Sequence, residues 1–217
     1  KSRFLGNMSH ELLTPMHQIL SFTKFGQKKS ATADRAKITS YFCKIRKGGE
    51  HLVNLLRNLL DLSHLESGDI VLNKKRDCLR VLIENVGAGF QTKLMEKNIK
   101  LFIKEPIWRT DLSCDSSLIT QVIQNILSNA INFSAKDTVI EITFVNNHLT
   151  PGKGTIEQDK GPSMTAFFRD QGIGIPESEM KAIFDAFTQS SQTEDGSGGR
   201  GLGLSICKEI VKLHKGS

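Results

Sequence analysis

The chain of 217 residues is poor in aromatic residues and has no long apolar run. Aromatic residues make up 6% of it, with one Trp and one Tyr, so a base-stacking surface for nucleic acid is not expected. No stretch approaches the ~20 apolar residues that a membrane-spanning helix needs, and no signal peptide is recognisable. A piece cut from a membrane-anchored receptor is still compatible with this pattern.

The cysteines and charges also exclude several classes of protein. The four cysteines form no C-x-x-C pair and show no zinc-type spacing with the histidines, so we expect reduced thiols in a cytoplasmic protein. The formal net charge is +6, but the basic residues are scattered, with only short runs such as residues 74–76. Nucleic acid is therefore not an expected partner. A hydrophobic content of 38% is ordinary for a fold with a core.

Two long helices are predicted at the start of the chain, over residues 4–27 and 35–66, with a short polar turn over 28–34. In the second helix, apolar residues recur at alternating steps of three and four, which is a heptad seam in which Gly48 fills the one gap. The seam consists of Ile38, Tyr41, Ile45, Leu52, Leu55, Leu59 and Leu62. An antiparallel hairpin is expected, completed either as a four-helix bundle from two chains or by packing on the rest of its own chain.

After residue 67 the pattern changes to a mixture of helices and strands. Gly68 is a suitable C-cap for the second helix. Further helices are predicted over 79–96, 118–133 and 202–214, and strands over 99–103, 138–145 and 164–169. This order predicts an α+β two-layer sandwich, with a mixed sheet covered by helices on one face.

The first chemical motif is Ser9–Pro15, S-H-E-L-L-T-P, inside the first predicted helix. His10, Thr14 and His17 share one face, because spacings of four and seven return to the same side of a helix. The proline removes an amide donor and is expected to bend the helix. A neutral imidazole is a good nucleophile when a carboxylate such as that of Glu11 fixes its tautomer and supports the developing charge. The alternative is a surface histidine beside a chance glutamate.

Three asparagines form the second motif. Asn125, Asn129 and Asn132 recur at steps of four and three, so they form one polar stripe on an otherwise apolar helix. Amide oxygens are hard ligands that suit Mg²⁺. Asparagine is a poor helix former, so three on one face indicate a purpose such as a magnesium site. Ordinary amides on a helix surface are the alternative.

Two glycine motifs follow. Asp170–Pro176, D-Q-G-I-G-I-P, comes directly after a predicted strand and combines an acceptor for an exocyclic amine with backbone that can approach a flat ring. Gly196–Leu204, G-S-G-G-R-G-L-G-L, leads into the last helix, as phosphate-binding loops do. It is neither a dinucleotide-binding fingerprint, because no strand precedes it, nor a P-loop, because no Gly-Lys-Ser/Thr follows. An ordinary turn and a flexible linker are the alternatives.

In this order the motifs resemble the sequence boxes of the sensor histidine kinases of two-component systems, over essentially the whole chain. Ser9–Pro15 resembles the H box, Asn125–Ser134 the N box and Asp170–Ile175 the G1 box. Ile183–Phe187 is similar to the F box, and Gly199–Leu204 to the G2 box. The F box continues as F-T-Q, a style frequent among hybrid kinases with attached receiver domains.

The resemblance implies a dimerisation and histidine-phosphotransfer domain over 1–67 and an ATP-binding domain over 68–217. By similarity, His10 takes the γ-phosphoryl group of ATP with the help of Glu11, and an aspartate on the receiver domain of a response regulator then receives it. Thr14 would also support dephosphorylation of that partner. A homodimer through the first two helices is implied, with any membrane attachment in a preceding region.

The resemblance also implies which residues bind Mg²⁺ and ATP. Asn129, with Asn125 nearby, would coordinate Mg²⁺. Asp170 would accept a hydrogen bond from the adenine amine. The implied nucleotide-binding residues are Asn125, Asn129, Asn132, Asp170, Gly172, Gly174, Phe187, Gly199, Arg200, Gly201, Leu202 and Gly203.

Three residues depart from the family pattern: Leu13 replaces Arg in the H box, Asn132 replaces Lys in the N box, and Arg200 replaces Thr in the G2 box. Weaker ATP binding or slower transfer is expected, with Arg200 restoring part of the lost charge. The chain ends before the family's closing strands, so a C-terminally truncated domain is expected. Two alternatives are a catalytically weakened sensor or scaffold of this fold and another ATPase of the superfamily, against which the hairpin argues.

Overall fold

The structure is a computed structural model that describes residues 2–68, 70–106, 108–146, 163–193 and 201–216. The chain divides into two compact units, Lys1–Gly68 and Asp69–Ser217, and each is described by itself. None of the described helices combines the length and the apolar character that crossing a bilayer requires.

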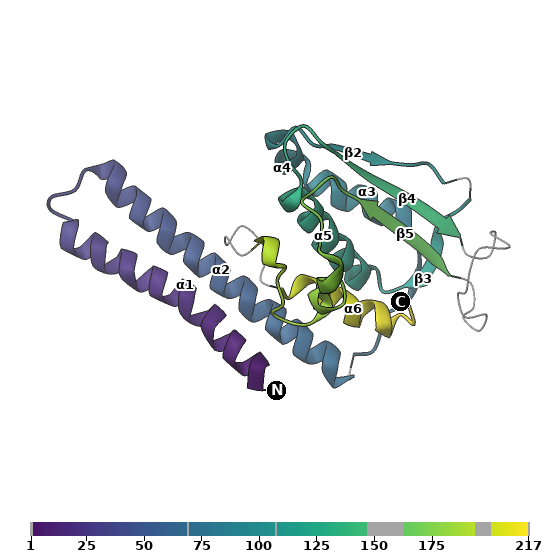
Figure 1. Cartoon of the computed structure of the whole chain (residues 1–217), viewed down its shortest axis with the longest axis horizontal. Coiled ribbons are helices and arrows are strands. Elements are labelled where there is room, and N and C mark those ends of the chain that lie inside the picture. The colour runs from purple at the N-terminus through teal and green to yellow at the C-terminus, as the bar shows by residue number, and fades with distance from the viewer. Residues whose placement is uncertain (1, 69, 107, 147–162, 194–200, 217) are drawn as a thin grey trace. The chain divides into compact units, whose positions relative to one another are not determined.

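The first unit is an antiparallel hairpin of two helices, α1 (Ser2–Lys29) and α2 (Arg35–Ser67), drawn in purple and blue in Figure 1. Helix α2 begins at the N-cap Asp34, whose side chain accepts a hydrogen bond of 2.7 Å from the backbone N–H of Lys37. It ends at Gly68, whose φ of 75° is the left-handed conformation expected of a glycine C-cap. The predicted hairpin and its C-cap are confirmed.

The predicted heptad seam of α2 faces α1. Tyr41 and Leu55 are buried in it, and so is Gly48. A Cβ atom on Gly48 would lie 2.9 Å from Cγ1 of Ile19 and 3.4 Å from the carbonyl oxygen of Pro15. The gap in the seam is therefore a place where the two helices approach too closely for a side chain.

The second unit contains a three-stranded mixed sheet in the order β2-β4-β5 and a separate antiparallel pair, β1-β3. In the larger sheet, β2 is parallel to β4, and β5 is antiparallel to β4. The strands are β1 (Lys75–Cys78), β2 (Lys100–Ile103), β3 (Asp111–Cys114), β4 (Val139–Asn146) and β5 (Met164–Arg169). The α-helices are α3 (Leu79–Gly89), α4 (Gln91–Glu96), α5 (Ser116–Phe133) and α6 (Gly203–Leu213), and single 3-10 turns occupy Glu177–Glu179, Ala182–Phe184 and Ser191–Thr193.

The core of the second unit lies between one face of the larger sheet and helices α3 and α5 (Figure 1). Residues alternate along the strands: Ile140 and Ile142 of β4 are fully buried, whereas Phe102 of β2 and Phe167 of β5 are more than half exposed. Helix α5 packs on α6 as well as on α3. The predicted α+β sandwich with helices on one face of the sheet is confirmed.

Two details of the sequence-based prediction were wrong. The single helix expected over 79–96 is two helices, because the chain leaves helical geometry at Phe90, with φ −97° and ψ 4°, directly after Gly89. Glycine weakens a helix interior. Beyond this break, Leu94 of α4 still belongs to the hydrophobic core. Strands β1 and β3 were not predicted, since each has only four residues: β1 is mostly polar, and the polar-apolar alternation of β3 is too short to stand out.

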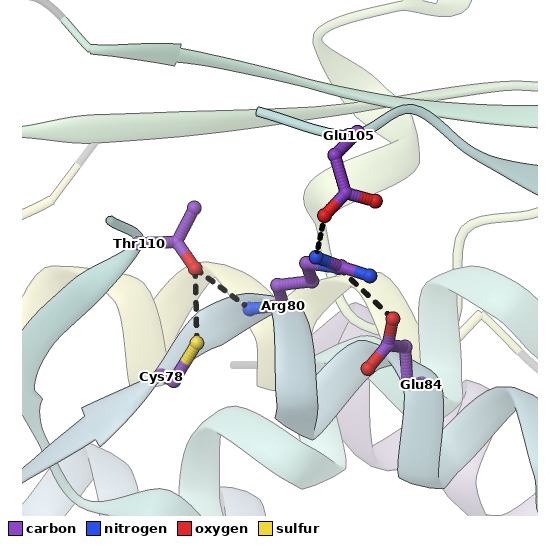
Figure 2. Close-up of polar contacts among 5 residues, drawn as sticks. All are labelled: Cys78, Arg80, Glu84, Glu105 and Thr110. Atoms are coloured by element: carbon purple, nitrogen blue, oxygen red, sulfur yellow. Dashed lines mark hydrogen bonds and ion pairs between the residues drawn. The ribbon is translucent and has the colours of Figure 1, made fainter. Parts of the chain in front are cut away.

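A cluster of polar contacts joins the β1-β3 pair to α3 (Figure 2). The N-cap residue of α3, Cys78, makes no capping hydrogen bond with its own side chain. Instead the buried hydroxyl of Thr110 accepts the backbone N–H of Arg80 at 3.2 Å and lies 3.1 Å from the Cys78 sulfur. The Arg80 guanidinium pairs with Glu84 and Glu105. These contacts replace a local cap with one from a distant segment.

Candidate active site

The H-box residues lie along the middle of α1. His10, Thr14 and His17 are exposed, and Glu11 is half-buried. The Thr14 hydroxyl donates a hydrogen bond of 3.1 Å to the carbonyl oxygen of His10, one turn back. The hairpin thus presents the imidazole of His10 to solvent on a helix that is continuous through the buried Pro15.

The three asparagines of α5 have different surroundings. Asn125 and Asn129 are half-buried, and Asn132 is exposed. The Asn125 amide donates a hydrogen bond of 3.3 Å to the carbonyl oxygen of Gly203, the first residue of α6. Among the residues that the structure describes, the carboxamides of Asn129 and Asn132 have no hydrogen-bond partner. Asn129 therefore offers a half-buried hard oxygen that suits Mg²⁺.

A thiol lies in the contact between α5 and α6. Cys207 is buried, and its sulfur contacts the carbonyl oxygen of Val122 at 3.8 Å. Burial raises the pKa of this thiol to about 11. Cys207 therefore stays protonated near neutral pH and acts as a packing group rather than as a nucleophile.

The G1-box residues form a tight turn beyond β5. The exposed carboxylate of Asp170 accepts the backbone N–H of Gly172 at 2.8 Å. A Cβ atom on Gly172 would lie 2.8 Å from that carboxylate oxygen and 3.0 Å from the carbonyl oxygen of Phe133, so no side chain fits. Gly174 has a φ of 75°. A β-bridge between Ser134 and Gly172 ties this turn to the end of α5, so the N box and the G1 box meet.

The F-box residue Phe187 and the end of the G2 box are also in contact. Phe187 is buried with a φ of 63°, and its backbone N–H donates to the carbonyl oxygen of Gly201 at 2.9 Å. Gly201 has a φ of 68°, and a Cβ atom there would lie 2.4 Å from the carbonyl oxygen of Thr188. Leu202 is buried and Gly203 is half-buried at the start of α6. Gly199 and Arg200 lie outside the described residues.

Sequence reasoning missed Glu179, whose carboxylate joins the two ends of the segment that contains the F box. The Glu179 carboxylate accepts hydrogen bonds of 2.5 Å from the hydroxyl of Ser190 and 2.6 Å from that of Ser191, and another from the Ser191 backbone N–H. These bonds, with that of Ser190 the largest cause, hold the pKa of Glu179 below its ordinary value. A glutamate and two serines eleven and twelve residues later carry no sequence pattern that would have revealed the contact.

Comparisons with known families match both units. Residues 1–68 match the family model of the His Kinase A (phospho-acceptor) domain. Residues 114–217 match the model of the histidine kinase-, DNA gyrase B- and HSP90-like ATPases. The two matches together cover the hairpin and, in the second unit, all the predicted N-box, G1-box, F-box and G2-box residues.

Two similar proteins are sensor kinases much longer than this chain. The sensor protein GacS of Pseudomonas syringae pv. syringae is 30% identical over an alignment of 217 positions that covers 98% of this chain and 22% of GacS. The hybrid signal transduction histidine kinase D of Dictyostelium discoideum is 31% identical over an alignment of 223 positions that covers 100% of this chain and 14% of that protein. The chain thus spans less than a quarter of the length of either relative.

Among solved structures, the histidine kinase ThkA in complex with the response regulator protein TrrA has the same fold. The TM-score is 0.69 at 23% identity, with 99% of this chain and 55% of that chain covered. The two family matches, the sensor-kinase relatives and this fold agree with one another. The chain belongs to the sensor histidine kinases, with a HisKA unit followed by an ATPase unit of the type shared with DNA gyrase B and HSP90.

Proposed function

We propose that this chain is a kinase core that transfers the γ-phosphoryl group of Mg²⁺-ATP to His10 and then to an aspartate on a response-regulator receiver domain. Residues 1–67 serve as the dimerisation and phosphotransfer domain, and residues 68–217 as the ATP-binding domain. The observation that carries the proposal is the exposed imidazole of His10, in one chain with a carboxylate and glycine turn at Asp170–Gly172.

At His10, a ring nitrogen of the neutral imidazole bonds to the γ-phosphorus while the bond from that phosphorus to the bridging oxygen breaks, and ADP leaves. The Glu11 carboxylate supports the positive charge that develops on the ring. In the second transfer the N–P bond breaks as a carboxylate oxygen of the receiver domain forms its bond to phosphorus. We assign Thr14 to the reverse regulatory activity, dephosphorylation of that partner.

In the second unit, the Asp170 carboxylate accepts the exocyclic amine of adenine, and Gly172 and Gly174 let the backbone approach the ring. Asn129 is the principal amide ligand of Mg²⁺, and Asn125 is the second, through its oxygen, while its NH₂ group holds α6. When bound, Mg²⁺ neutralises charge on the phosphates. The remaining nucleotide contacts are assigned to Asn132, Phe187, Gly199, Arg200, Gly201, Leu202 and Gly203.

The hairpin also has an apolar face that is free for a second copy of the chain. Six apolar residues, each 44–59% exposed, recur at steps of three and four on the two helices. They are Leu13, Met16 and Leu20 on α1, and Val53, Leu56 and Leu60 on α2. Packing these faces together in a four-helix bundle would remove them from water, so we propose a homodimer through both helices. Because the proposed kinase uses ATP, we also propose that this part of the protein lies in the cytoplasm.

The decisive experiment is to incubate the chain with Mg²⁺ and γ-labelled ATP and to test the stability of the label. We expect an acid-labile, alkali-stable phosphate that is lost in His10→Ala. His17→Ala is the matched control, because His17 is another exposed histidine on the same face of α1 and should leave labelling intact.

Three other outcomes would contradict the proposal. ATP binding without labelling would indicate a sensor or scaffold that keeps the fold without efficient chemistry. Release of free phosphate without a labelled protein would instead indicate an ATPase that does not use the histidine. Labelling that survives in His10→Ala would move the phosphoacceptor to another residue.

A further inference from the structure

The ammonium group of Lys97 lies at the C-terminal end of α5. Its Nζ donates hydrogen bonds to three carbonyl oxygens, at 2.8 Å to Ile131, 2.8 Å to Asn132 and 3.0 Å to Ser134. The last carbonyls of a helix have no partner within the helix and carry partial negative charge. A lysine more than thirty residues earlier in the chain therefore closes the N-box helix.

The backbone around Lys97 is fixed independently of this ammonium group. Asn98 follows the end of α4 with a φ of 52°, and its side-chain amide donates to the Asp137 carboxylate at 2.6 Å. The backbone N–H of Asp137 donates to the carbonyl oxygen of Lys97, and that of Lys100 donates to Thr138, both at 3.0 Å. The turn before β2 and the turn before β4 are thus joined, and Lys97 is aimed at α5 from this joint.

The third carbonyl that accepts from Lys97 belongs to Ser134, which pairs with the turn at Asp170–Gly172 that we propose binds the base. Ser134 is 3% exposed and forms a β-bridge with Gly172. Gly172 in turn donates its N–H to the carboxylate of Asp170. A continuous path of hydrogen bonds and backbone pairing therefore runs from Lys97 through Ser134 and Gly172 to Asp170.

We propose that Lys97 is a positioning residue for adenine recognition: its ammonium holds the end of α5, which fixes the Ser134–Gly172 pairing and so the place of the Asp170 carboxylate. This rests on the proposed function, in which Asp170 reads the exocyclic amine of the base. No sequence motif includes Lys97, and Arg200 is the residue expected from the sequence to substitute for the cation absent at Asn132. In contrast to a phosphate-binding lysine, Lys97 acts on the base, through carbonyl groups.

The test compares two nucleotides that differ at the atom that Asp170 reads. ATP has an amine at position 6 of the purine, and ITP has a carbonyl oxygen there, which a carboxylate repels. Dissociation constants for both, with Mg²⁺, are measured by calorimetry on the 217-residue chain, on Lys97→Met and on Lys100→Met. Lys100 is the matched control, because it is an exposed lysine three residues away on β2.

We expect Lys97→Met to bind ATP about tenfold more weakly, the effect of losing roughly one charge-assisted hydrogen bond. Its ITP affinity should change less than about threefold, so that the preference for ATP collapses, whereas Lys100→Met keeps it. Lys97→Arg should restore part of the preference, since its charge is kept but its planar fork fits three carbonyls less well.

An equal loss of affinity for ATP and ITP in Lys97→Met would overturn the inference, because it would show a general structural role. An unchanged ATP preference would overturn it as well. If Lys97→Met does not fold, Lys97→Gln, which keeps a shorter donor, is measured against the same two outcomes. A wild-type chain with no preference for ATP over ITP would instead refute the proposed role of Asp170, and the inference with it.

Discussion

The two units hold their functional groups in different ways. In the hairpin, the position of His10 follows from helical periodicity, and the hydrogen bond that the Thr14 hydroxyl donates to the His10 carbonyl joins residues four apart. In the second unit, Asn125 bonds to Gly203, 78 residues away, and the turn at Asp170 depends on a pairing with Ser134. The hairpin is therefore a simple support for the proposed phosphoacceptor, whereas the proposed nucleotide site of the second unit is assembled from distant segments.

Because of this difference, we expect substitutions in the two units to have different consequences. A change on the exposed face of the hairpin should alter chemistry or dimerisation with little effect on the fold. A change at the joints of the second unit should alter geometry first and chemistry as a consequence, because several segments share each contact. Paired variants, one in each class of environment, test this distinction.

After the complete loss of label in His10→Ala, the largest effect is expected for Asn129→Ala. Changes even to the partners of metal ligands cost ~10–100-fold, so removing a ligand itself should slow labelling of His10 about a hundredfold or more. Labelling by γ-labelled ATP measures this. Sedimentation of the same variant should show an unchanged dimer, because the hairpin is untouched.

Gln124→Ala is the matched control for that variant. Gln124 is an exposed amide on the same helix, five residues earlier, and has no part in the proposed site. We expect its labelling rate to stay within about twofold of the wild type, as surface substitutions usually do. Equal loss of labelling in both variants would mean that the substitutions disrupt α5. It would then contradict the proposal that Asn129 is a Mg²⁺ ligand.

The next largest effect is expected for Gly201→Ala in the second unit. The residue has a φ of 68°, and the new Cβ would lie 2.4 Å from the carbonyl oxygen and 2.6 Å from the nitrogen of Thr188. Backbone cannot move aside as a side chain can, so we expect a loss of about 3 kcal/mol or more. Urea unfolding followed by the fluorescence of Trp108, the one tryptophan, measures it.

Gly174→Ala separates conformation from contact in the same unit. Gly174 has a φ of 75°, but among the described residues beyond its chain neighbours no atom lies within 4 Å of its Cβ position, so we expect only the conformational cost of about 1–2 kcal/mol. If the two variants lose the same stability, the close packing of Gly201 on the F box is not a stabilising contact.

The sequence was sufficient for those parts of the fold that follow from local pattern. The heptad seam predicted the hairpin, and the missing member at Gly48 proved to be a close approach to Pro15. The β-branched alternation over 138–145 predicted β4, in which buried residues alternate with more exposed ones. In each case the signal and the structure that it forms lie in the same short segment, so pattern and outcome are directly linked.

The hydrogen bonds that join distant segments of the second unit could not be predicted, because signal and structure do not lie in one short segment. Lys97 and Glu179 look like ordinary surface residues, because their partners are separated from them by many residues and have no fixed spacing. Asn125 was grouped with Asn129 by helical period, yet the structure uses its amide to hold α6. Periodicity identifies a face, but the contacts of that face depend on tertiary packing.

A smaller effect, of opposite sign at two neighbours, is expected in the hairpin. A Cβ on Gly48 would meet Cγ1 of Ile19 at 2.9 Å, whereas one on Gly49 would have no atom of the described residues within 4 Å outside its own turn of α2. Gly48→Ala gains about 1 kcal/mol of helix propensity but overpacks the helix contact by about 1–3 kcal/mol, so we expect a net loss of about 1 kcal/mol.

Gly49→Ala gains the propensity alone and should stabilise the hairpin by about 0.5–1 kcal/mol. Thermal unfolding followed by helical circular dichroism measures both variants, preferably with the second unit's Trp108 signal recorded in parallel. A gain of stability in both would show that α1 moves away from α2 easily, and that the hairpin is less tightly packed than its buried glycine indicates.

The smallest effect is expected when the pH is lowered, which should reduce the stability of the second unit. Hydrogen bonds from Ser116 hold the pKa of Asp77 below its ordinary value, those of Ser117 do so for Asp115, and those of Ser190 for Glu179. Each carboxyl thus has a lower pKa in the folded chain than in the unfolded one. As the pH falls, the unfolded chain therefore binds protons before the folded chain does. The stabilisation is complete near neutral pH and begins to decline near the ordinary carboxyl pKa values of about 4. It is lost below the folded-state pKa values.

Urea midpoints from Trp108 fluorescence, measured between neutral pH and pH values below about 4, should therefore fall as the solution is acidified. Glu179→Gln should flatten this dependence and lower the midpoint at neutral pH, because the amide presents one acceptor oxygen where the carboxylate presents two to Ser190 and Ser191. A variant with the wild-type slope would mean that Glu179 carries no net charge-assisted bonding in solution. The F-box segment would then be held chiefly by the backbone bond between Phe187 and Gly201, and the second unit would depend on fewer distant joints than the comparison with the hairpin implies.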